Sequence, residues 1–211
     1  MALFEKCWTN TSLVIESFFT RCMHDIEPYY NWLKYYNPAK DLRSPFYGKQ
    51  YNFDQYSETI YGYYIDPAWD FMGSETLYIK VLFTDYEKGF AVIEFLGEWN
   101  DAINNDIMLL KRDYLDELNY FGINKYILIG ENVLNFHTSD DSYYEEWFEE
   151  NEEEGWIVMI NFRDHVLKEF KHAGLDYYIN YGGELDEFDW RKFSPGQVFG
   201  NVSKIIHKRL H

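Results

Sequence analysis

Apolar residues in the middle of the chain recur first at every second position and then at every third or fourth, which predicts strands alternating with helices. Residues 76–84 alternate, with the odd-numbered apolar residues on one side of a strand, and Gly89 ends the turn that follows. The next strand, at 90–95, is apolar on both sides except at Glu94, as expected in a sheet covered by helices. These two strands predict a hairpin at the start of an α/β domain.

The chain after this hairpin is predicted to continue as alternating helices and strands. Ile103 begins the apolar stripe of the first helix, and Phe148 belongs to the stripe of the second. Gly97, Gly122 and Gly174 are interpreted as stops at the ends of elements. The predicted elements are a helix at 101–121, a strand at 126–129, a loop at 130–142, a helix at 143–154, a strand at 156–160, a helix at 163–173, a strand at 177–179 and a final helix at 195–209.

The first 75 residues follow a different pattern. Apolar spacing predicts a helix from residue 11 that Pro28 ends or kinks, a second short helix at 29–36 and a strand at 57–65. Proline, glycine and aromatic residues dominate the rest of this segment. We therefore expect residues 1–75 to be a helical and irregular extension packed on the core, and residues 76–211 to be an α/β domain with a C-terminal helix.

Composition narrows the choice of partner. The formal net charge is -17, which argues against nucleic acid and against an anionic membrane surface, because both attract basic proteins. The sequence has no apolar run long enough for a membrane span and no secretory pattern at its start, so we expect a cytoplasmic protein in which Cys7 and Cys22 are reduced. With 20 tyrosines, 17 phenylalanines and 7 tryptophans, some aromatic side chains must face solvent, and a homodimer through the aromatic N-terminal region is a further hypothesis.

The loop before the second helix is the strongest candidate for a functional site. It places Thr, Ser and Asp side chains directly before a helix, where they can cap free N–H groups. A dense acidic run follows, which we interpret first as a solvated helix face and alternatively as a docking face for a basic protein. The candidate partner-binding or phosphate-accepting residues are His137, Thr138, Ser139, Asp140, Asp141 and Ser142, and the acidic run contains Glu145, Glu146, Glu149, Glu150, Glu152, Glu153 and Glu154.

No stretch of the sequence matches a catalytic signature for a nucleotide, a dinucleotide, a serine nucleophile or a zinc protease. His137 with Asp140 and Asp141 could hold a divalent cation, but a capped loop with a half-exposed histidine explains the same residues more simply. We therefore predict no catalytic residue, no metal ion and no cofactor.

Residues 76–181 resemble the STAS domain, a family that includes anti-sigma-factor antagonists and the cytoplasmic tails of sulphate transporters. The predicted order of hairpin, helix, strand, acidic helix, strand, helix and strand is similar to the order of elements in that family. The segments that carry the resemblance are Phe-Leu-Gly-Glu-Trp at 95–99, the helix at 107–118, Tyr-Ile-Leu-Ile at 126–129 with Val133 and Phe136, the strand and helix at 155–160 and 166–170, and Ala-Gly-Leu-Asp at 173–176. The resemblance implies an α/β fold with a STAS-like mixed sheet and packed helices, to which this chain adds an aromatic-rich N-terminal extension.

The resemblance also bears on the candidate loop. Regulated members of the family carry Asp-Ser-Ser-Gly at the start of the helix after the central strand, where a serine is phosphorylated to break contact with a kinase partner. The matching positions here are His137, Thr138, Ser139 and Asp140, so the aspartate and the glycine are missing. A phosphate on Thr138 or Ser139 would be favoured by the helix N-terminus but repelled by Asp140 and Asp141.

These observations favour a non-enzymatic regulatory or protein-interaction domain that binds a protein partner through residues 135–142 and the following acidic helix. The alternative is a small-molecule-binding protein or hydrolase, with a pocket walled by the aromatic extension and a carboxylate site at Asp140 or Asp141. A binder should present an exposed loop, whereas an enzyme should bring titratable groups together in a concave site.

Overall fold

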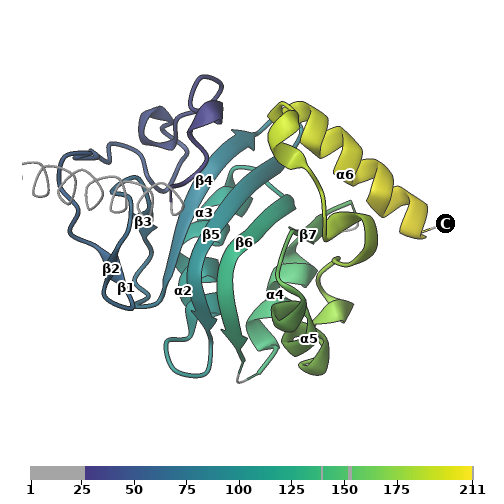
Figure 1. Cartoon of the computed structure of the whole chain (residues 1–211). Coiled ribbons are helices and arrows are strands. Elements are labelled where there is room, and N and C mark those ends of the chain that lie inside the picture. Colours follow the sequence, from purple (N-terminus) through teal and green to yellow (C-terminus); the bar gives the residue numbers. More distant parts are fainter. Residues whose placement is uncertain (1–26, 139, 152–153, 211) are drawn as a thin grey trace, which may run out of the picture.

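The computed structural model describes residues 27–138, 140–151 and 154–210, and it is built around one mixed sheet (Figure 1). The strands lie in the order β3-β4-β5-β6-β7, antiparallel from β3 to β5 and parallel from β5 to β7. Their bounds are β3 Asp70–Phe71, β4 Leu77–Asp85, β5 Phe90–Asn100, β6 Lys125–His137 and β7 Trp156–Ile160. The predicted α/β class with a mixed sheet is confirmed. The helix predicted near residues 11–26, and both cysteines, lie outside the described residues.

Helices cover both faces of the sheet. The main core joins one face to α2, α4 and α5, and a second core joins the opposite face to α6 (Figure 1). Because β5 and β6 are covered on both sides, their apolar residues face two cores, as the sequence predicted. The helices are α2 Asp106–Leu110, a π-helical turn at Lys111–Leu115, α3 Asp116–Tyr120, α4 Ser142–Glu150, α5 Asp164–His172 and α6 Pro195–Leu210.

The hairpin of β4 and β5 agrees with the sequence pattern in all but one respect. Gly89 has a φ of 68°, so it fills the left-handed position of the turn as predicted. The register shifts between Val81 and Phe83. This bulge turns Phe83 toward the α6 side, whereas Leu77 to Val81 keep their odd-numbered residues in the main core. The prediction that all four odd residues share one side is wrong for Phe83.

Strands β5 and β6 are longer than predicted. Gly97 and Gly130 were interpreted as strand ends, but each lies inside its strand. A Cβ on Gly130 would lie 2.3 Å from the ring of Phe162, so glycine is there for close packing and not to end the strand. The parallel pairing continues to Asn100 and His137 through two irregularities in register. Most of the segment predicted as a loop at 130–142 is therefore strand.

Several shorter elements also differ from prediction. The expected strand at 57–65 is broken by a turn into β1 Thr59–Ile60 and β2 Tyr63–Tyr64. The expected helix at 101–121 begins at Asp106, and the expected helix at 29–36 is one 3₁₀ turn, Tyr30–Trp32. The expected strand at 177–179 is replaced by the 3₁₀ turn Leu175–Tyr177 and one bridge between Val158 and Asn180. The other small 3₁₀ turns are Pro38–Lys40, Gly183–Leu185 and Trp190–Lys192.

The helices at the end of the chain are predicted better. Helix α4 ends at Glu150, whereas the sequence predicted a helix to residue 154, and residues 152–153 lie outside the described residues. Helix α5 buries Val166, Leu167 and Phe170, as predicted. Helix α6 buries Val198, Val202 and Ile206, and Arg209 near its end is exposed and donates to the backbone carbonyl oxygens of Tyr181 and Gly182. The amphipathic pattern thus predicted these helices well.

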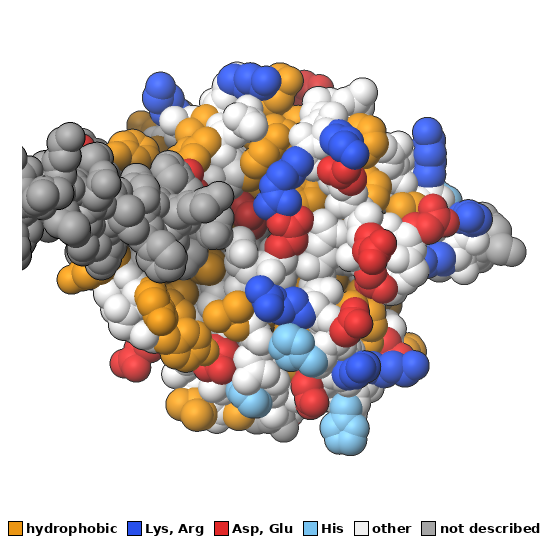
Figure 2. Space-filling model, in the orientation of Figure 1, with side chains coloured by type: hydrophobic (Ala, Val, Ile, Leu, Met, Phe, Trp, Pro, Cys, Tyr) orange, Lys and Arg blue, Asp and Glu red, His pale blue; other side chains and the backbone are white. Residues whose placement is uncertain are grey.

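The described part of the N-terminal extension lies against the sheet. Phe46 and Met72 belong to the main core, and β3 joins the sheet as its edge strand. Hydrophobic side chains also gather on the surface around β1, β2 and β3 (Figure 2). Tyr63, for example, is 71% exposed. The homodimer through this region and the division at residue 75 stay predictions. Among the described residues, no helix is both long and apolar enough to cross a membrane.

Candidate functional site

The predicted functional loop lies where the parallel strands β5 and β6 end (Figure 1). His137 is the last residue of β6 and pairs with Asn100, the last residue of β5. Helix α4 begins at Ser142, so only a short turn separates strand from helix. Ser139 lies outside the described residues. Ligands of open α/β sheets commonly bind beyond this edge, which makes it the first place to search.

Asp101 holds this edge together from inside. Its carboxylate accepts hydrogen bonds from Trp99 Nε1 at 3.0 Å, from the backbone N–H of Ile107 at 2.8 Å and from the Tyr144 hydroxyl at 2.6 Å. Its backbone N–H donates to the carbonyl oxygen of His137 at 2.7 Å. Burial raises the pKa of Asp101 to about 7, although these bonds favour the ionised form. One buried side chain therefore ties β5, α2 and α4 together beneath the loop.

The predicted loop residues bond mainly to one another and to nearby turns. Asp140 Oδ1 accepts from the backbone N–H of Ser142 at 3.1 Å and from its hydroxyl at 2.5 Å. The Thr138 hydroxyl donates to the carbonyl oxygen of Asp140 at 3.0 Å. Asp141 Oδ2 accepts from the hydroxyl of Tyr178 at 3.0 Å. Asp140 thus forms a local turn directly before α4, and Asp141 fixes the loop to the turn after α5.

The histidine of the loop is oriented by a different group. His137 Nε2 is 2.9 Å from Asn135 Nδ2, and Asn135 donates to Glu98 Oε1 at 3.2 Å. Across the described ranges, no group of three or more His, Cys, Asp or Glu side chains is arranged to hold a metal ion. The arrangement gives no support to the interpretation of His137, Asp140 and Asp141 as a divalent-cation site.

A hollow of about 460 Å³ opens beside the loop. Three segments that are distant in the sequence line it: Asn100, Ala102 and Ile103; Phe136, His137 and Thr138; Glu169, His172 and Ala173. Ile103, on its rim, is 81% exposed, although the sequence assigned it to a buried stripe. Neither Asp140 nor Asp141 lines this hollow, and none of its lining residues belongs to the N-terminal extension. The aromatic-walled carboxylate pocket of the alternative hypothesis is not formed here.

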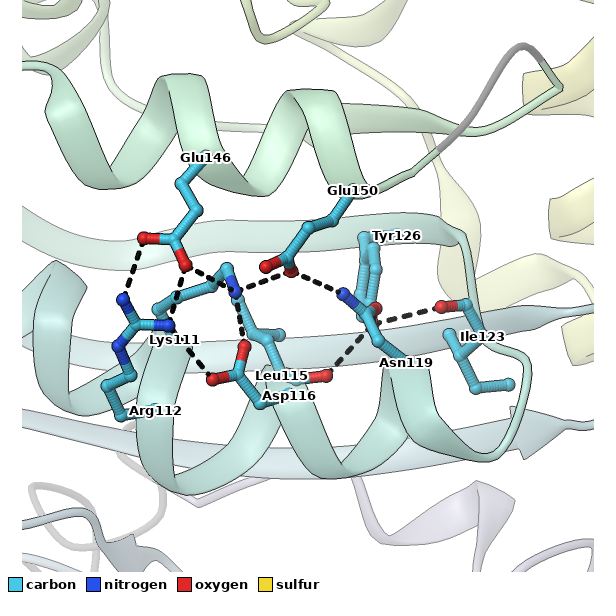
Figure 3. Close-up of polar contacts among 9 residues, drawn as sticks. All are labelled: Lys111, Arg112, Leu115, Asp116, Asn119, Ile123, Tyr126, Glu146 and Glu150. Carbon is cyan, nitrogen blue, oxygen red and sulfur yellow. Dashed lines mark hydrogen bonds and ion pairs between the residues drawn. The ribbon is translucent and has the colours of Figure 1, made fainter.

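The acidic helix α4 is divided between two roles. Its inner glutamates face the neighbouring helix, where Arg112 holds Glu146 through two nitrogens at 2.6 and 2.7 Å (Figure 3). The Lys111 side chain is fully buried, and its ammonium bonds Glu150 at 2.5 Å and also Asp116. A fully solvated acidic face would require these glutamates to be free. They are instead bound by Lys111 and Arg112.

The outer side of α4 is both acidic and aromatic. Glu145 and Glu149 are exposed there, and Phe148 between them is 42% exposed. The Phe148 ring centre is 6.0 Å from that of Tyr177 and 5.9 Å from that of Tyr178. The sequence assigned Phe148 to a buried stripe and Tyr177 to a strand, but Tyr177 is 75% exposed. Since Tyr178 also bonds Asp141, these rings adjoin the predicted loop.

A second buried carboxylate lies within the sheet, away from the loop. Glu94, on β5, is 1% exposed. Its Oε2 accepts from the backbone N–H of Tyr29 at 2.9 Å, while Oε1 has no hydrogen bond among the described residues and lies 4.0 Å from Arg191 Nη2. Burial raises the pKa of Glu94 to about 7, against the opposing effects of Tyr29 and Arg191. The folded protein therefore binds a proton at Glu94 more readily than the unfolded chain.

This shift predicts a pH-dependent stability. Because the folded pKa lies above the ordinary value, the stabilisation from protonated Glu94 is present below about pH 4.5 and is lost as the pH rises through about 7. Glu94→Gln should raise the free energy of unfolding at pH 8 by roughly 1–3 kcal/mol and flatten its dependence between pH 5 and 8. Urea denaturation at pH 5.5 and 8 measures both effects, and Glu117→Gln, at an exposed position, is the control. An unchanged pH profile in Glu94→Gln would contradict the prediction.

Comparison with known proteins gives a likeness of fold alone. No protein-family model matches the chain, and no curated protein matches it. The chain is similar to the solved structure of the anti-sigma factor antagonist SpoIIAA in its unphosphorylated form, with a TM-score of 0.41, 16% identity, and coverage of 55% of this chain and 98% of that one. It is also similar to the Bacillus cell fate determinant SpoIIAA in the phosphorylated form, with a TM-score of 0.36, 16% identity, and coverage of 53% and 96%. These similarities assign no binding residue to this chain.

Proposed function

We propose that the protein is a non-enzymatic interaction module that binds a protein partner at the edge where β5 and β6 end. The surface that we assign to the partner, called the partner face below, consists of Ile103, the loop 137–142, and Glu145, Phe148, Glu149 and Tyr177. A cytoplasmic location and a basic partner, both predicted from the sequence, are parts of this proposal.

The observation that carries the proposal is a fixed loop bordered by exposed apolar side chains. Asp101 and Tyr178 hold the loop from below, while Ile103, Phe148 and Tyr177 expose 81%, 42% and 75% of their surface. Exposed aromatic side chains on a rigid support bind partners with little loss of conformational entropy. The exposure of these apolar side chains to water does not stabilise the domain itself.

Charge on the partner face favours a basic partner. Glu145 and Glu149 have no cation bound to them in the described part of the chain, in contrast to Glu146 and Glu150. Exposed acidic side chains accelerate encounter with a basic protein and contribute less to the lifetime of the complex. A phosphate on Thr138, which lies within this acidic surface, would add negative charge there and change the encounter. The predicted modification of Thr138 or Ser139 is part of this proposal.

The first test is a pull-down from native cell extract with three purified proteins. These are the wild type, Phe148→Ala/Tyr177→Ala, and the control Tyr120→Ala. Tyr120 is also a highly exposed aromatic residue, at 84%, but it lies at the end of α3 next to the start of β6, at the opposite edge of the sheet. The captured protein is then purified and its Kd for each variant is measured.

We expect the double variant to bind the captured protein at least about tenfold more weakly than wild type, because aromatic residues at the centre of an interface each contribute on the order of 1–2 kcal/mol or more. Tyr120→Ala should bind like wild type. Glu145→Gln/Glu149→Gln should slow association at low ionic strength and have little effect on dissociation. Equal binding by wild type and Phe148→Ala/Tyr177→Ala, or an equal loss in Tyr120→Ala, would refute the partner face.

A further inference from the structure

A second hollow, of about 410 Å³, lies at the other end of the sheet, beside the turn that joins β4 to β5. Its lining comes from the extension and from the end of β4: Leu33, Lys34, Tyr35, Tyr36, Asn37, Lys40, Asp41 and Arg43, with Thr84 and Tyr86. Figure 2 shows basic side chains along the upper edge of the view, above the first described part of the chain. The hollow shares no residue with the partner face.

Three cations line this hollow in a protein whose net charge is -17. Lys34 and Lys40 are exposed and form no ion pair within the described ranges. Arg43 lies with its guanidinium carbon 3.6 Å from the centre of the Tyr86 ring, and its Nε is 3.5 Å from Asp41 Oδ1. The lysines are thus held near one another without a carboxylate to neutralise either of them, so the local potential is positive despite the overall charge.

Asp41 is the one carboxylate among the lining residues, and its oxygens are already bonded. It accepts from the Tyr36 hydroxyl at 3.1 Å and from the backbone N–H of Arg43 at 3.1 Å. Burial opposes ionisation, but the Arg43 backbone and the Tyr86 and Tyr36 hydroxyls together lower the pKa of Asp41. Asp41 therefore orients Arg43 and the tyrosines, and its single charge does not balance the three cations.

Neutral donors complete the lining. Thr84 is 6% exposed, and its hydroxyl makes no hydrogen bond in the described structure, although it lies close enough to the Tyr36 hydroxyl to influence its pKa. Burial raises the pKa of Tyr36 and of Tyr86, so both phenols stay protonated at neutral pH, and the Tyr36 hydroxyl directs its proton to Asp41.

We propose that this hollow binds a small molecule through a phosphate or diphosphate group, with Lys34, Lys40 and Arg43 as its cationic contacts. Arginine and lysine are the side chains that bind phosphate oxygens in proteins through charge-assisted hydrogen bonds. The open shape suits an anion that enters from solvent and keeps part of its hydration. The site is independent of the partner face, because the two lie at opposite ends of β5.

Isothermal titration with inorganic pyrophosphate at low ionic strength tests the site. The proteins are the wild type, Lys34→Ala/Lys40→Ala and the control Lys168→Ala/Lys204→Ala. Both double variants remove two exposed lysines that form no ion pair in the described ranges, so they change the net charge equally.

We expect wild type to bind pyrophosphate in the micromolar to millimolar range and Lys34→Ala/Lys40→Ala to bind at least about tenfold more weakly, since two of the three cationic contacts are removed. The control pair should stay within about twofold of wild type, and raising the salt from about 20 to 200 mM should weaken binding. No binding to wild type, equal weakening in the control pair, or binding only to vesicles of anionic phospholipid would overturn the proposal of a small-molecule phosphate site.

Discussion

Replacing Gly97 by alanine is expected to destabilise the protein by at least about 3 kcal/mol. Gly97 has a φ of 117°, a conformation that costs a residue with a side chain roughly 1–3 kcal/mol. An added Cβ would also lie 2.0 Å from the backbone oxygen of Thr76, directly before β4, and backbone next to a paired strand cannot move aside as a flexible side chain can. That oxygen accepts the N–H of Glu98 at 2.8 Å, so a shift of Thr76 would also break this bond.

The matched control for this prediction is Gly174→Ala. Gly174 also has a positive φ, of 75°, but an added Cβ meets nothing within 4 Å. The Gly174→Ala substitution should therefore lower the free energy of unfolding only by the cost of the left-handed backbone conformation, roughly 1–2 kcal/mol. Urea denaturation of both variants and wild type gives the difference in the free energy of unfolding. Equal losses in Gly97→Ala and Gly174→Ala would show that the contact with Thr76 does not restrict this position.

The same residue explains why the sequence predicted the wrong length for β5. A glycine after an apolar run is typical of a strand end, and the interpretation of Gly97 followed that rule. Here Gly97 allows a local irregularity that brings β5 close to the backbone before β4, and the strand then continues for three residues to Asn100. Such a close approach depends on tertiary packing, which the pattern along one strand does not contain.

The start of α2 was missed for a similar reason. The apolar spacing from Ile103 predicted a helix with its first turn near Asp101. In the structure the carboxylate of Asp106 accepts the backbone N–H of Asn100 at 2.7 Å, and Asp101 accepts that of Ile107. These bonds hold residues 101–105 in an irregular turn, which leaves Ile103 on the surface. Side chains that compete with the helix for backbone donors decide such boundaries, and periodicity does not detect them.

The candidate site could likewise be predicted only in those parts that depend on neighbouring residues in the sequence. The loop at 137–142 was found from its capping residues before a helix, which is local chemistry. Its hollow could not be found, because Ile103 and His172 reach it from segments separated by about seventy residues of sequence. The resemblance to STAS domains predicted the mixed sheet but not the exposed Phe148 and Tyr177, which depend on how α4 and the turn after α5 meet.

Removing the Lys111 ammonium, which bonds the acidic helix α4, is also expected to cause a large loss of stability. The Lys111 side chain is fully buried, and its Nζ bonds Asp116 and Glu150 and lies 3.7 Å from Glu146 (Figure 3). Burial alone would lower the pKa of Lys111, but the bonds to Asp116 and Glu150 outweigh it and raise that pKa. The lysine is therefore charged at neutral pH, and its ammonium lies between three carboxylates.

Lys111→Met keeps most of the apolar contacts of the side chain and removes only its charge. Among the described residues, Arg112 is then the cation that remains for three carboxylates facing one another, and Glu150 keeps only the amide of Asn119, at 3.2 Å. Breaking a fully buried ion pair costs about 3–5 kcal/mol. Because the three carboxylates are 34–39% exposed and can bind water again, we expect a loss at the lower end, about 2–3 kcal/mol.

Arg112→Met is the matched control within the same network. Arg112 is 45% exposed, so although it makes a two-point contact with Glu146 its removal should destabilise the protein much less than the loss of Lys111. Adding Glu150→Gln to Lys111→Met should restore part of the lost stability, because it removes one of the repelling charges. Urea denaturation at pH 7 measures all three variants. If Lys111→Met and Arg112→Met lose equal stability, burial does not strengthen the lysine contacts, and α4 is held mainly by the packing of Tyr144 and Trp147.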